Sequence, residues 1–310
     1  MPIVLLFNPN SGRGKGTAAA REIASHLRAQ QVQIVEVELA RTLTHADFTS
    51  TLEGARALIA IGGDGTVSFA APAVAQTNVP IYHLPLGTEN LFSREFAMTA
   101  TPDAISKALT QFRIKRVDLA RCNNQTMLLV ASFGPDASII HRLAQKRKGA
   151  ISHRTYLTPI VSELRHLTFT RHRVTVDGQE MTCEDPSIVI VANSRQYAAR
   201  LDPAQDAKMD DGLLDVAILP YTTRANLIAW AGQLKFARSR ARKRMHYQQG
   251  RQVTVESIDR PLIAQIDGEA ISCESNKADV TINPGALPVL LPDPSEIRGR
   301  PQASGARGFC

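Results

Sequence analysis

The chain has 310 residues and a formal net charge of +7 at pH 7, with 44% hydrophobic and 21% charged residues. These values are typical of a globular protein with one large core or two ordinary ones. The cysteines lie far apart without metal-ligand spacing, which argues against a zinc site. No secretory leader or membrane-spanning apolar run is visible, so we expect a reducing, cytoplasmic location.

The first predicted strand is the apolar run Ile3–Phe7, and an amphipathic helix is predicted near Ala18–Leu27. The loop between them, from Asn8 to Gly16, is rich in glycine and polar residues. Its spacing fits neither a Walker A loop nor a dinucleotide fingerprint. Arg13 and Lys15 in this loop either neutralise phosphates or are ordinary solvated charges.

The next informative segment is the buried strand Ala57–Ile61, which runs directly into the glycine-rich turn Gly62–Ser68. A strand–turn–helix junction points backbone N–H groups at an anion, and glycine lets that anion approach. Asp64 would repel a phosphate unless a divalent cation, a nearby basic residue or a proton offsets its charge. The alternative is a tight turn with an Asx-type hydrogen bond.

A third junction follows the strand Val79–Leu84 and reads Pro85–Arg94. Here Thr88 and Asn90 either cap the following helix or contact a nucleotide. All three loops follow the carboxyl ends of predicted parallel strands. We therefore expect them to meet at one edge of the sheet, where open α/β folds bind ligands.

Strands and helices alternate up to about Gln111, whereas short strands dominate from Arg113 onward. These strands are predicted at 113–121, 126–133, 172–176, 187–192, 214–219, 252–256, 262–266 and 279–282, with helices near 137–146, 154–167 and 224–236. We predict a nucleotide-binding α/β domain with a parallel sheet over 1–112 and a mainly antiparallel β-sandwich substrate domain over 113–291. Residues 292–310 read as a disordered basic tail.

Three segments, Asn8–Gly12, Gly62–Thr66 and Pro85–Asn90, resemble in order and spacing the diacylglycerol kinase catalytic-domain family. This family includes bacterial lipid kinases and sphingosine and ceramide kinases, and it is related to NAD kinases. The resemblance continues through Phe133–Ala137, Asp210–Val216 and Asp267–Glu269, so it spans about residues 3 to 290.

The resemblance implies an ATP-dependent lipid kinase that phosphorylates a lipid hydroxyl, with diacylglycerol or a sphingoid or ceramide lipid as acceptor. ATP would be the co-substrate and would contact Asn8, Pro9, Asn10, Ser11, Gly12, Thr42, Gly62, Gly63, Asp64, Gly65, Thr66, Val67, Ser68, Thr88 and Asn90. Glu269, and with less support Asp267, would be the general base. Asp64 would bind catalytic magnesium through water or orient the acceptor hydroxyl. Without the resemblance, Asp267-Gly268 reads as a hairpin turn.

The resemblance also implies a second Mg²⁺ site, formed by Asp211 with the backbone carbonyls of Lys208 and Leu213. This site would be remote from the chemistry and would hold the two domains in position. A helix cap or a turn at Asp210–Asp211 explains the same residues equally well.

Two basic groups lie in acid-free parts of the chain. The members are Lys235, Arg238, Arg240, Arg242, Lys243, Arg244 and Arg251 in the first group, and Arg142, Lys146, Arg147, Lys148 and Arg154 in the second. Both fit an anionic membrane surface, or else a solvated basic face. Interleaved aromatic residues are few and no nucleic-acid motif is visible, so nucleic acid is not an expected partner.

The chain departs from the family pattern at Leu91, where an aspartate is common, and at Ala198-Ala199-Arg200, where glycine is common. These changes put the identity of the lipid in doubt. Two alternatives therefore stay open: a kinase of a soluble acceptor such as NAD, and a non-catalytic protein that binds nucleotide or lipid. The sequence indicates no oligomeric state.

Overall fold

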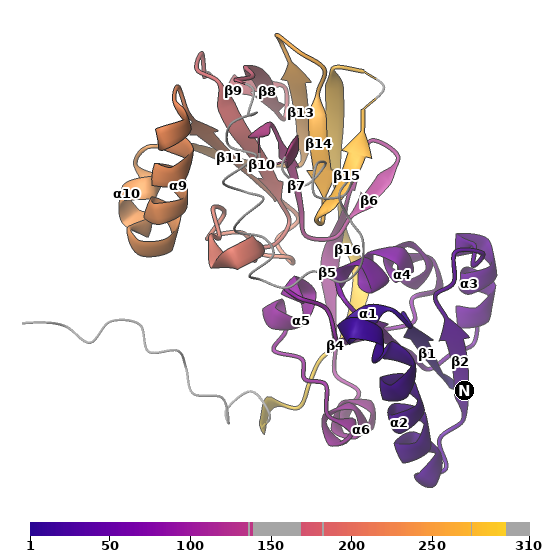
Figure 1. The fold of residues 1–310 in the computed structure, drawn as a ribbon. Helices are drawn as coiled ribbons and strands as arrows, with labels where there is room; N and C mark the ends of the chain where they lie inside the picture. Colours follow the sequence, from indigo (N-terminus) through magenta and orange to yellow (C-terminus); the bar gives the residue numbers. More distant parts are fainter. Residues whose placement is uncertain (136, 139–168, 182, 274, 296–310) are drawn as a thin grey trace, which may run out of the picture.

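The computed structural model describes residues 1–295 except 136, 139–168, 182 and 274. Figure 1 shows two lobes, an α/β lobe formed by the first third of the chain and a β-rich lobe formed by most of the remainder. The predicted helices at 137–146 and 154–167 lie outside the described residues, apart from Ala137 and Ser138. The predicted tail lies outside them beyond Ser295, and so does the second basic group.

The first lobe is built on four parallel strands in the order β2-β1-β3-β4. They are β1 (Ile3–Phe7), β2 (Ile34–Glu38), β3 (Ala57–Gly62) and β4 (Ile81–Pro85). Every residue of β1 and β3 is buried, because helices cover both faces of the sheet. This confirms the predicted parallel α/β architecture.

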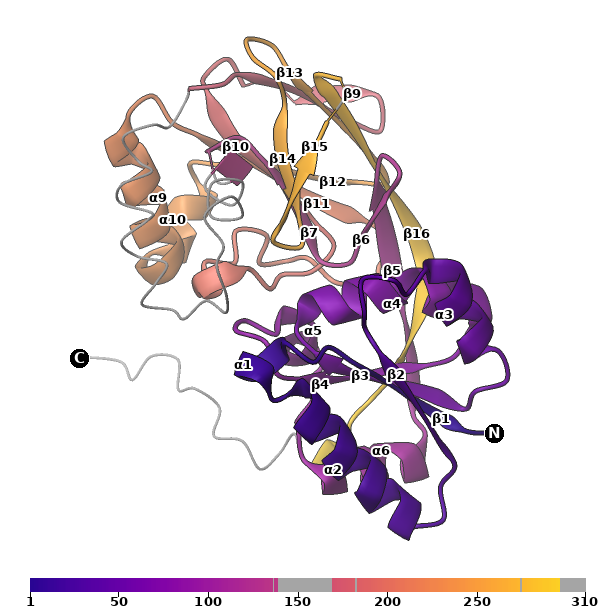
Figure 2. The same ribbon diagram turned by 45° about the vertical axis from the view of Figure 1, so that its right-hand side comes forward.

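In Figure 2, α3 and α4 cover one face of this sheet, while α2 and α6 cover the other. The helices are α1 (Ser11–Gly14), α2 (Gly16–Ala29), α3 (His45–Leu52), α4 (Asp64–Thr77), α5 (Leu91–Glu95) and α6 (Pro102–Gln111). The Thr44 and Thr101 hydroxyls cap α3 and α6, accepting from backbone N–H groups three residues later. These caps explain where both helices begin.

Two long antiparallel strands, β5 (Ile114–Cys122) and β16 (Lys277–Leu290), connect the lobes. Near its end β16 also pairs in parallel with β4, where Val289 lies opposite Ile81. The first sheet therefore continues into the second lobe as a sheet of ten strands. Because β5 and β16 belong to both lobes, the division between residues 112 and 113 stays a prediction.

The strand predicted at 279–282 is much longer in the structure, so its predicted end was wrong. Asn283-Pro284-Gly285 reads as a turn in the sequence, but the structure accommodates it as an irregularity in the β5–β16 ladder. Gly285 has a φ of 61° there, and its N–H donates to the Asp118 carboxylate at 2.7 Å. The residues beyond it, including Leu287 and Val289, complete the core of the first lobe.

The second lobe is a β-sandwich, as predicted. Its six-stranded antiparallel sheet has the order β12-β11-β10-β7-β14-β15 and packs on the outer strands of the ten-stranded sheet. Besides β5 and β16, the strands of the second lobe, from both sheets, are β6 (Gln125–Met127), β7 (Val130–Phe133), β8 (His172–Val176), β9 (Gln179–Met181), β10 (Ser187–Ala192), β11 (Leu214–Pro220), β12 (His246–Gly250), β13 (Gln252–Ser257), β14 (Ile263–Ile266) and β15 (Glu269–Ser272). Valines and isoleucines of both sheets form one buried cluster.

The strand predicted at 126–133 was wrong in one respect, because it is two strands, β6 and β7. The break falls at Leu128 and Leu129, whose N–H groups bind the Asp267 carboxylate. Three strands of the second lobe, β9, β12 and β15, were not predicted, and in the first lobe β2 was not predicted either. Each of the three carries polar residues such as Gln179, Gln248 or Glu269 where an apolar run would have marked a strand.

Two helices, α9 (Arg224–Phe236) and α10 (Arg238–Arg242), and one 3₁₀ turn, η2 (Ala198–Arg200), lie outside the sandwich. The bounds of α9 match the prediction. A capping box explains its start: the Thr223 hydroxyl accepts from the N–H of Asn226, whose side-chain oxygen accepts from the N–H of Thr223. None of the described helices is long and apolar enough to cross a membrane.

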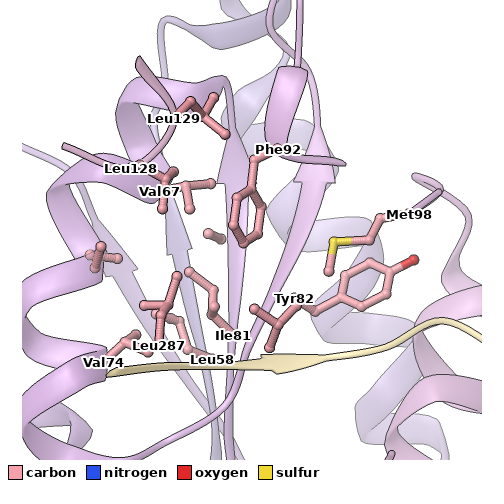
Figure 3. Close-up of a cluster of buried hydrophobic side chains, with 14 of the residues drawn as sticks. Leu58, Val67, Val74, Ile81, Tyr82, Phe92, Met98, Leu128, Leu129 and Leu287 are labelled. Atoms are coloured by element: carbon pink, nitrogen blue, oxygen red, sulfur yellow. The ribbon is translucent and has the colours of Figure 1, made fainter. Parts of the chain in front are cut away.

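The two lobes share one hydrophobic cluster. Figure 3 shows Leu128 and Leu129, from the β6–β7 connection, above Val67 of α4 and Phe92 of α5. Both leucines are fully buried. The second lobe is therefore anchored directly over the helices that follow β3 and β4.

Candidate active site

The three loops predicted to share a ligand meet in the structure. A Cβ built on Gly87 would lie 2.7 Å from the Cα of Gly63, so the loops after β3 and β4 are in backbone contact. A Cβ on Gly12 would lie 3.4 Å from the Leu86 carbonyl oxygen. One on Gly62 would lie 3.3 Å from the Ser11 Oγ, so the loop after β1 touches both others.

The loop after β1 has an unusual backbone. The Asn8 side-chain oxygen accepts from the Asn10 N–H at 3.0 Å, which forms an Asx turn. Gly12 and Arg13 follow with φ angles of 61° and 63° inside the short helix α1. The backbone thus changes from right-handed at Asn10 to left-handed at Gly12 and Arg13, and such a change is typical of loops that bind an anion.

Asp64 begins α4, but its carboxylate binds α5. The Leu91 N–H donates to Oδ2 and the Phe92 N–H to Oδ1, both at 2.9 Å. Asp64 therefore caps α5, a role that the sequence analysis had offered to Thr88 or Asn90. Each oxygen keeps further acceptor capacity, so a water or a metal can still bind.

Asn90 closes the third loop instead of capping the helix. Its Oδ1 accepts from the Gly87 N–H and its Nδ2 donates to the Gly87 carbonyl, both at 2.7 Å. Asn90 itself has a φ of 49°. Thr88 is exposed at the tip between them, and the loop thus presents it at the same edge as Gly63.

His83, a residue that the sequence analysis missed, lies beneath the second loop. It is fully buried on β4, and its Nε2 lies 3.0 Å from the Gly62 carbonyl oxygen. Because a carbonyl only accepts, Nε2 carries the proton, and Nδ1 has no hydrogen-bond partner among the described residues. Burial lowers the pKa of His83, although Asp64 and the Gly62 carbonyl act in the opposite direction. The sequence signal that could have identified His83 was a histidine within an otherwise apolar strand.

Thr42 lies in the loop between β2 and α3 and is exposed. The same loop contains Thr44, which donates its hydroxyl to Asp47 at 2.6 Å. Since β2 is parallel to β1, its carboxyl end lies at the same edge of the sheet as the three loops. The position of Thr42 is compatible with the nucleotide contact that the resemblance implies.

Asp267 and Gly268 form the two-residue turn between β14 and β15, with φ angles of 51° and 85°. The hairpin interpretation is therefore confirmed. The Asp267 carboxylate accepts from the N–H groups of Leu128, Leu129 and Val130 at 2.8, 2.8 and 3.0 Å. It also accepts from the Ser68 hydroxyl of α4 at 3.3 Å, which connects the two lobes.

Burial raises the pKa of Asp267 to about 6, against the effect of its three N–H donors, and the charge of Asp64 adds to the rise. The carboxylates of Asp64 and Asp267 therefore interact across the boundary between the lobes. Because its acceptor sites are directed at the backbone and at Ser68, Asp267 is suited to position the turn. It is less suited to collect a substrate proton.

Glu269 is the first residue of β15 and is exposed. It follows the turn Asp267-Gly268, and Asp267 accepts from the Ser68 hydroxyl of α4 where the two lobes meet. Glu269 is therefore an exposed carboxylate two residues from this contact. Its position is compatible with the role of general base that the resemblance implies.

Residues 208–211 of the Lys208–Leu213 segment line a pocket of about 550 Å³ between the lobes, together with Glu95, Lys115 and Asp206. Asp211 Oδ1 accepts from the Leu213 N–H at 3.1 Å, which confirms a turn here. Asp210 pairs with Lys115 at 2.8 Å. These contacts leave Asp211 Oδ2 and nearby carbonyls as hard oxygen donors that suit magnesium.

The described residues contain no cluster of three or more His, Cys, Asp or Glu side chains arranged to hold a metal. A magnesium ion at Asp211 would therefore depend on the Lys208 and Leu213 carbonyls and on water. Asp118, a buried residue of β5, was not predicted as part of this segment. Its carboxylate accepts from the N–H groups of Gly212 and Gly285, both at 2.7 Å, and so joins this segment to β16.

Two family models match the chain. The model of the diacylglycerol kinase catalytic domain matches residues 2–122, and that of the YegS C-terminal NAD kinase β-sandwich-like domain matches residues 129–291. The chain belongs to the family of diacylglycerol kinase and YegS-like lipid kinases. The suspected resemblance is thereby confirmed, and membership indicates a phosphotransferase.

Relatives within this lipid kinase family cover most of the chain. A probable lipid kinase YegS-like of Pseudomonas fluorescens is 30% identical over 249 residues, which are 78% of this chain and 79% of the relative. A diacylglycerol kinase of Mycobacterium tuberculosis is 28% identical over 234 residues, 73% of this chain and 75% of the relative.

Solved structures share the fold. A putative diacylglycerol kinase of Bacillus anthracis superimposes with a TM-score of 0.73 at 21% identity, over 95% of this chain and 96% of that one. An NAD kinase of Archaeoglobus fulgidus solved with ATP gives a TM-score of 0.51 at 13% identity, over 96% of both chains. This chain therefore shares its fold with both solved proteins.

Proposed function

We propose that this protein is an ATP-dependent lipid kinase, which transfers the γ-phosphoryl group of ATP to the hydroxyl of a membrane lipid. The acceptor would be diacylglycerol or a sphingoid or ceramide lipid. The observation that carries the proposal is the meeting of the three glycine loops with the Asp267–Glu269 turn at one edge of the first sheet. Family membership and the relative named diacylglycerol kinase support the choice of acceptor.

The first lobe would hold the donor. The Asn8–Gly12 and Gly62–Ser68 loops would contact the phosphates, and the N–H groups at the amino-terminal end of α4 would bind phosphate oxygens. Thr42, Thr88 and Asn90 would contact the remainder of the nucleotide from adjacent loops. Magnesium, when bound, would offset the charge of the transferred group. Asp64 would hold it through water, and its carboxylate is fixed by two N–H groups of α5.

The second lobe would supply the base. Glu269 would accept the proton of the lipid hydroxyl as that oxygen forms its bond to the γ-phosphorus and the bond to the β-phosphate oxygen breaks. The products are the phosphorylated lipid and ADP. Asp267 would hold the turn that presents Glu269, through its bonds to the β6–β7 connection and Ser68. A magnesium ion at Asp211 would stabilise the contact between the lobes.

The proposal is tested with purified protein, radiolabelled ATP and magnesium, offered with mixed micelles of diacylglycerol, ceramide or sphingosine. Glu269→Gln is the informative variant, and Glu180→Gln is its control because Glu180 is an exposed carboxylate of the same lobe. Labelled lipid with wild type and Glu180→Gln, but not with Glu269→Gln, is expected.

The likeness to NAD kinase supports a second candidate acceptor, so NAD is offered in a parallel reaction. Labelled NADP without labelled lipid would replace the lipid kinase proposal. Nucleotide binding with no product from any acceptor would assign a non-catalytic role. The departures at Leu91 and Ala198–Arg200 make the choice among lipids an experimental question.

A further inference from the structure

One helix of the second lobe exposes large apolar side chains. Phe236 is 88% exposed and Ile228 is 61% exposed, and both belong to α9. They lie eight residues apart with Gly232 between them, so all three share one face of the helix. The opposite face is buried through Trp230 and Leu234. Packing against the sandwich therefore accounts for one side of α9 and leaves the apolar residues of the other side exposed.

The same outer face is basic. Arg224 and Lys235 are exposed and flank Ile228 on the helical surface. Two further exposed basic residues, Arg240 of α10 and Lys243 at its end, follow α9 in the chain. Neither Arg240 nor Lys243 has a charged partner within the part of the chain that the structure describes. Residues 216–255 contain eight Lys and Arg residues and no Asp or Glu. We call Arg224, Ile228, Gly232, Lys235, Phe236, Arg240 and Lys243 the α9 surface.

We propose that the α9 surface docks this protein on an anionic lipid bilayer. Phe236 and Ile228 would insert among the acyl chains near the headgroups, while the basic residues contact lipid phosphates. The biological purpose of this docking rests on the proposed function, since an enzyme with a lipid acceptor must reach a membrane. The evidence for the docking itself is the exposure and the charge of the α9 surface.

The charge of the α9 surface favours a lipid surface over a second copy of the chain. A twofold contact would place one basic face against an identical one, and the like charges would repel. An anionic bilayer offers the opposite charge together with an apolar interior. Single exposed apolar residues are ordinary, but an aromatic and a branched residue at helical spacing within an acid-free segment fit this partner.

Polar contacts connect α9 and α10 to residues 199–206, of which Asp206 lines the pocket between the lobes. Lys235 Nζ donates to the Ala199 carbonyl at 2.6 Å, and Arg238 pairs with Asp202 at 3.2 Å. Arg242 of α10 pairs at 3.0 Å with Asp206, which lines the pocket. Docking through α9 would therefore hold the second lobe, and this side of the pocket, beside the membrane.

Vesicle binding tests the inference with the full chain and without nucleotide. We expect co-sedimentation with vesicles of phosphatidylcholine and phosphatidylglycerol, and much less with phosphatidylcholine alone. Ile228→Ser with Phe236→Ser should weaken binding by roughly tenfold or more, because both side chains lose their transfer to the bilayer. The matched control is Ile258→Ser, an isoleucine 49% exposed elsewhere in the lobe, which should bind as wild type.

Charge is tested separately. Arg240→Gln with Lys243→Gln should weaken binding to the anionic vesicles by roughly tenfold, since each basic residue near such a surface contributes. Arg21→Gln with Arg28→Gln removes the same charge from α2 of the first lobe and is the control. If both double variants lost vesicle binding equally, net charge alone would explain the loss, and the assignment of the docking surface to α9 would be overturned.

Insertion is measured with Phe236→Trp. The only natural tryptophan, Trp230, is buried and provides the background. Brominated phosphatidylcholine in the anionic vesicles should quench the emission of Phe236→Trp strongly, and that of Ile258→Trp and wild type little. Equal quenching in all three proteins would overturn insertion. A dimer in solution that Phe236→Ser dissociates would assign the surface to a second copy and also overturn the inference.

The two proposals fail separately. Vesicle binding without phosphorylation of any lipid would remove the proposed function and leave the docking surface. Phosphorylation of a water-soluble short-chain diacylglycerol by a protein that does not bind vesicles would remove the docking surface and leave the proposed function.

Discussion

The two lobes contribute to the candidate site in different ways. The first lobe presents backbone: glycine loops packed so closely that the Cα of Gly63 would lie 2.7 Å from a Cβ on Gly87. The second lobe presents side chains on a hairpin, with Glu269 exposed and Asp267 hydrogen-bonded to three N–H groups. We therefore expect substitutions in the first-lobe loops to change activity through the packing of the backbone. Substitutions on the hairpin of the second lobe can change the chemical step and leave the fold intact.

The largest expected effect is that of Glu269→Gln, which should reduce kcat by roughly 10²- to 10⁴-fold because a general base is lost. Its side chain is exposed, so the melting temperature should stay that of wild type. Steady-state kinetics and thermal unfolding measure the two quantities. An unchanged kcat would show that Glu269 is not the base and would contradict a chemical role for the second lobe.

Asp267→Asn comes next, because an amide cannot accept from all the N–H groups that the carboxylate accepts. We expect the free energy of unfolding to fall by about 3 kcal/mol, as buried donors lose their acceptor. Urea denaturation at pH 7 measures it. The matched substitution Asp259→Asn removes an exposed carboxylate paired with Arg171 and should cost far less.

Asp267 also predicts a pH dependence of stability. Its pKa is raised to about 6 in the folded protein, above the value in the unfolded chain, so the folded state binds more protons between about pH 4 and 6. The contribution of this group to stability is therefore full below that range and is lost as pH rises through it. Asp267→Asn should remove this part of the slope, as urea midpoints across pH 4 to 7 would show; an unchanged slope would contradict the assignment.

Gly87→Ala should lower the free energy of unfolding by about 2 kcal/mol, because the new methyl overlaps the Gly63 backbone and Asn90 Oδ1. Affinity for ATP should fall as well, since the loops after β3 and β4 must separate. Gly65→Ala is the control for stability, because nothing lies within 4 Å of a Cβ at Gly65. Equal stability of both variants would show that the loops are not held by this contact.

The smallest effect is expected from His83→Gln. The loss or displacement of the hydrogen bond to the Gly62 carbonyl should cost about 1 kcal/mol and raise KM for ATP several-fold, with little change in kcat. Kinetics with ATP as the varied substrate separate the two constants. A change in kcat with KM preserved would move His83 from loop support to the chemical step.

Much of the architecture was predictable because it depends on local patterns. Apolar runs such as Ile3–Phe7 and Ala57–Ile61 predicted the buried parallel strands. The glycine-rich segments after these runs predicted the loops that lead into the next helices. The strands missed in the second lobe, β9, β12 and β15, are polar and form only because a neighbouring strand offers its hydrogen bonds. No property of their own sequence distinguishes them from loops.

The sequence by itself determined the α/β lobe, the β-sandwich, the order of the glycine loops and the hairpin at Asp267-Gly268, because each depends on residues close together in the chain. Only the tertiary structure decided that Asp64 caps α5, that Asp267 joins the β6–β7 connection to α4, and that β16 returns to the first sheet. These contacts join residues far apart in sequence. Apart from the Ser68 hydroxyl, Asp64 and Asp267 bind backbone N–H groups, which every residue except proline carries, so no pattern of side chains could have indicated these contacts.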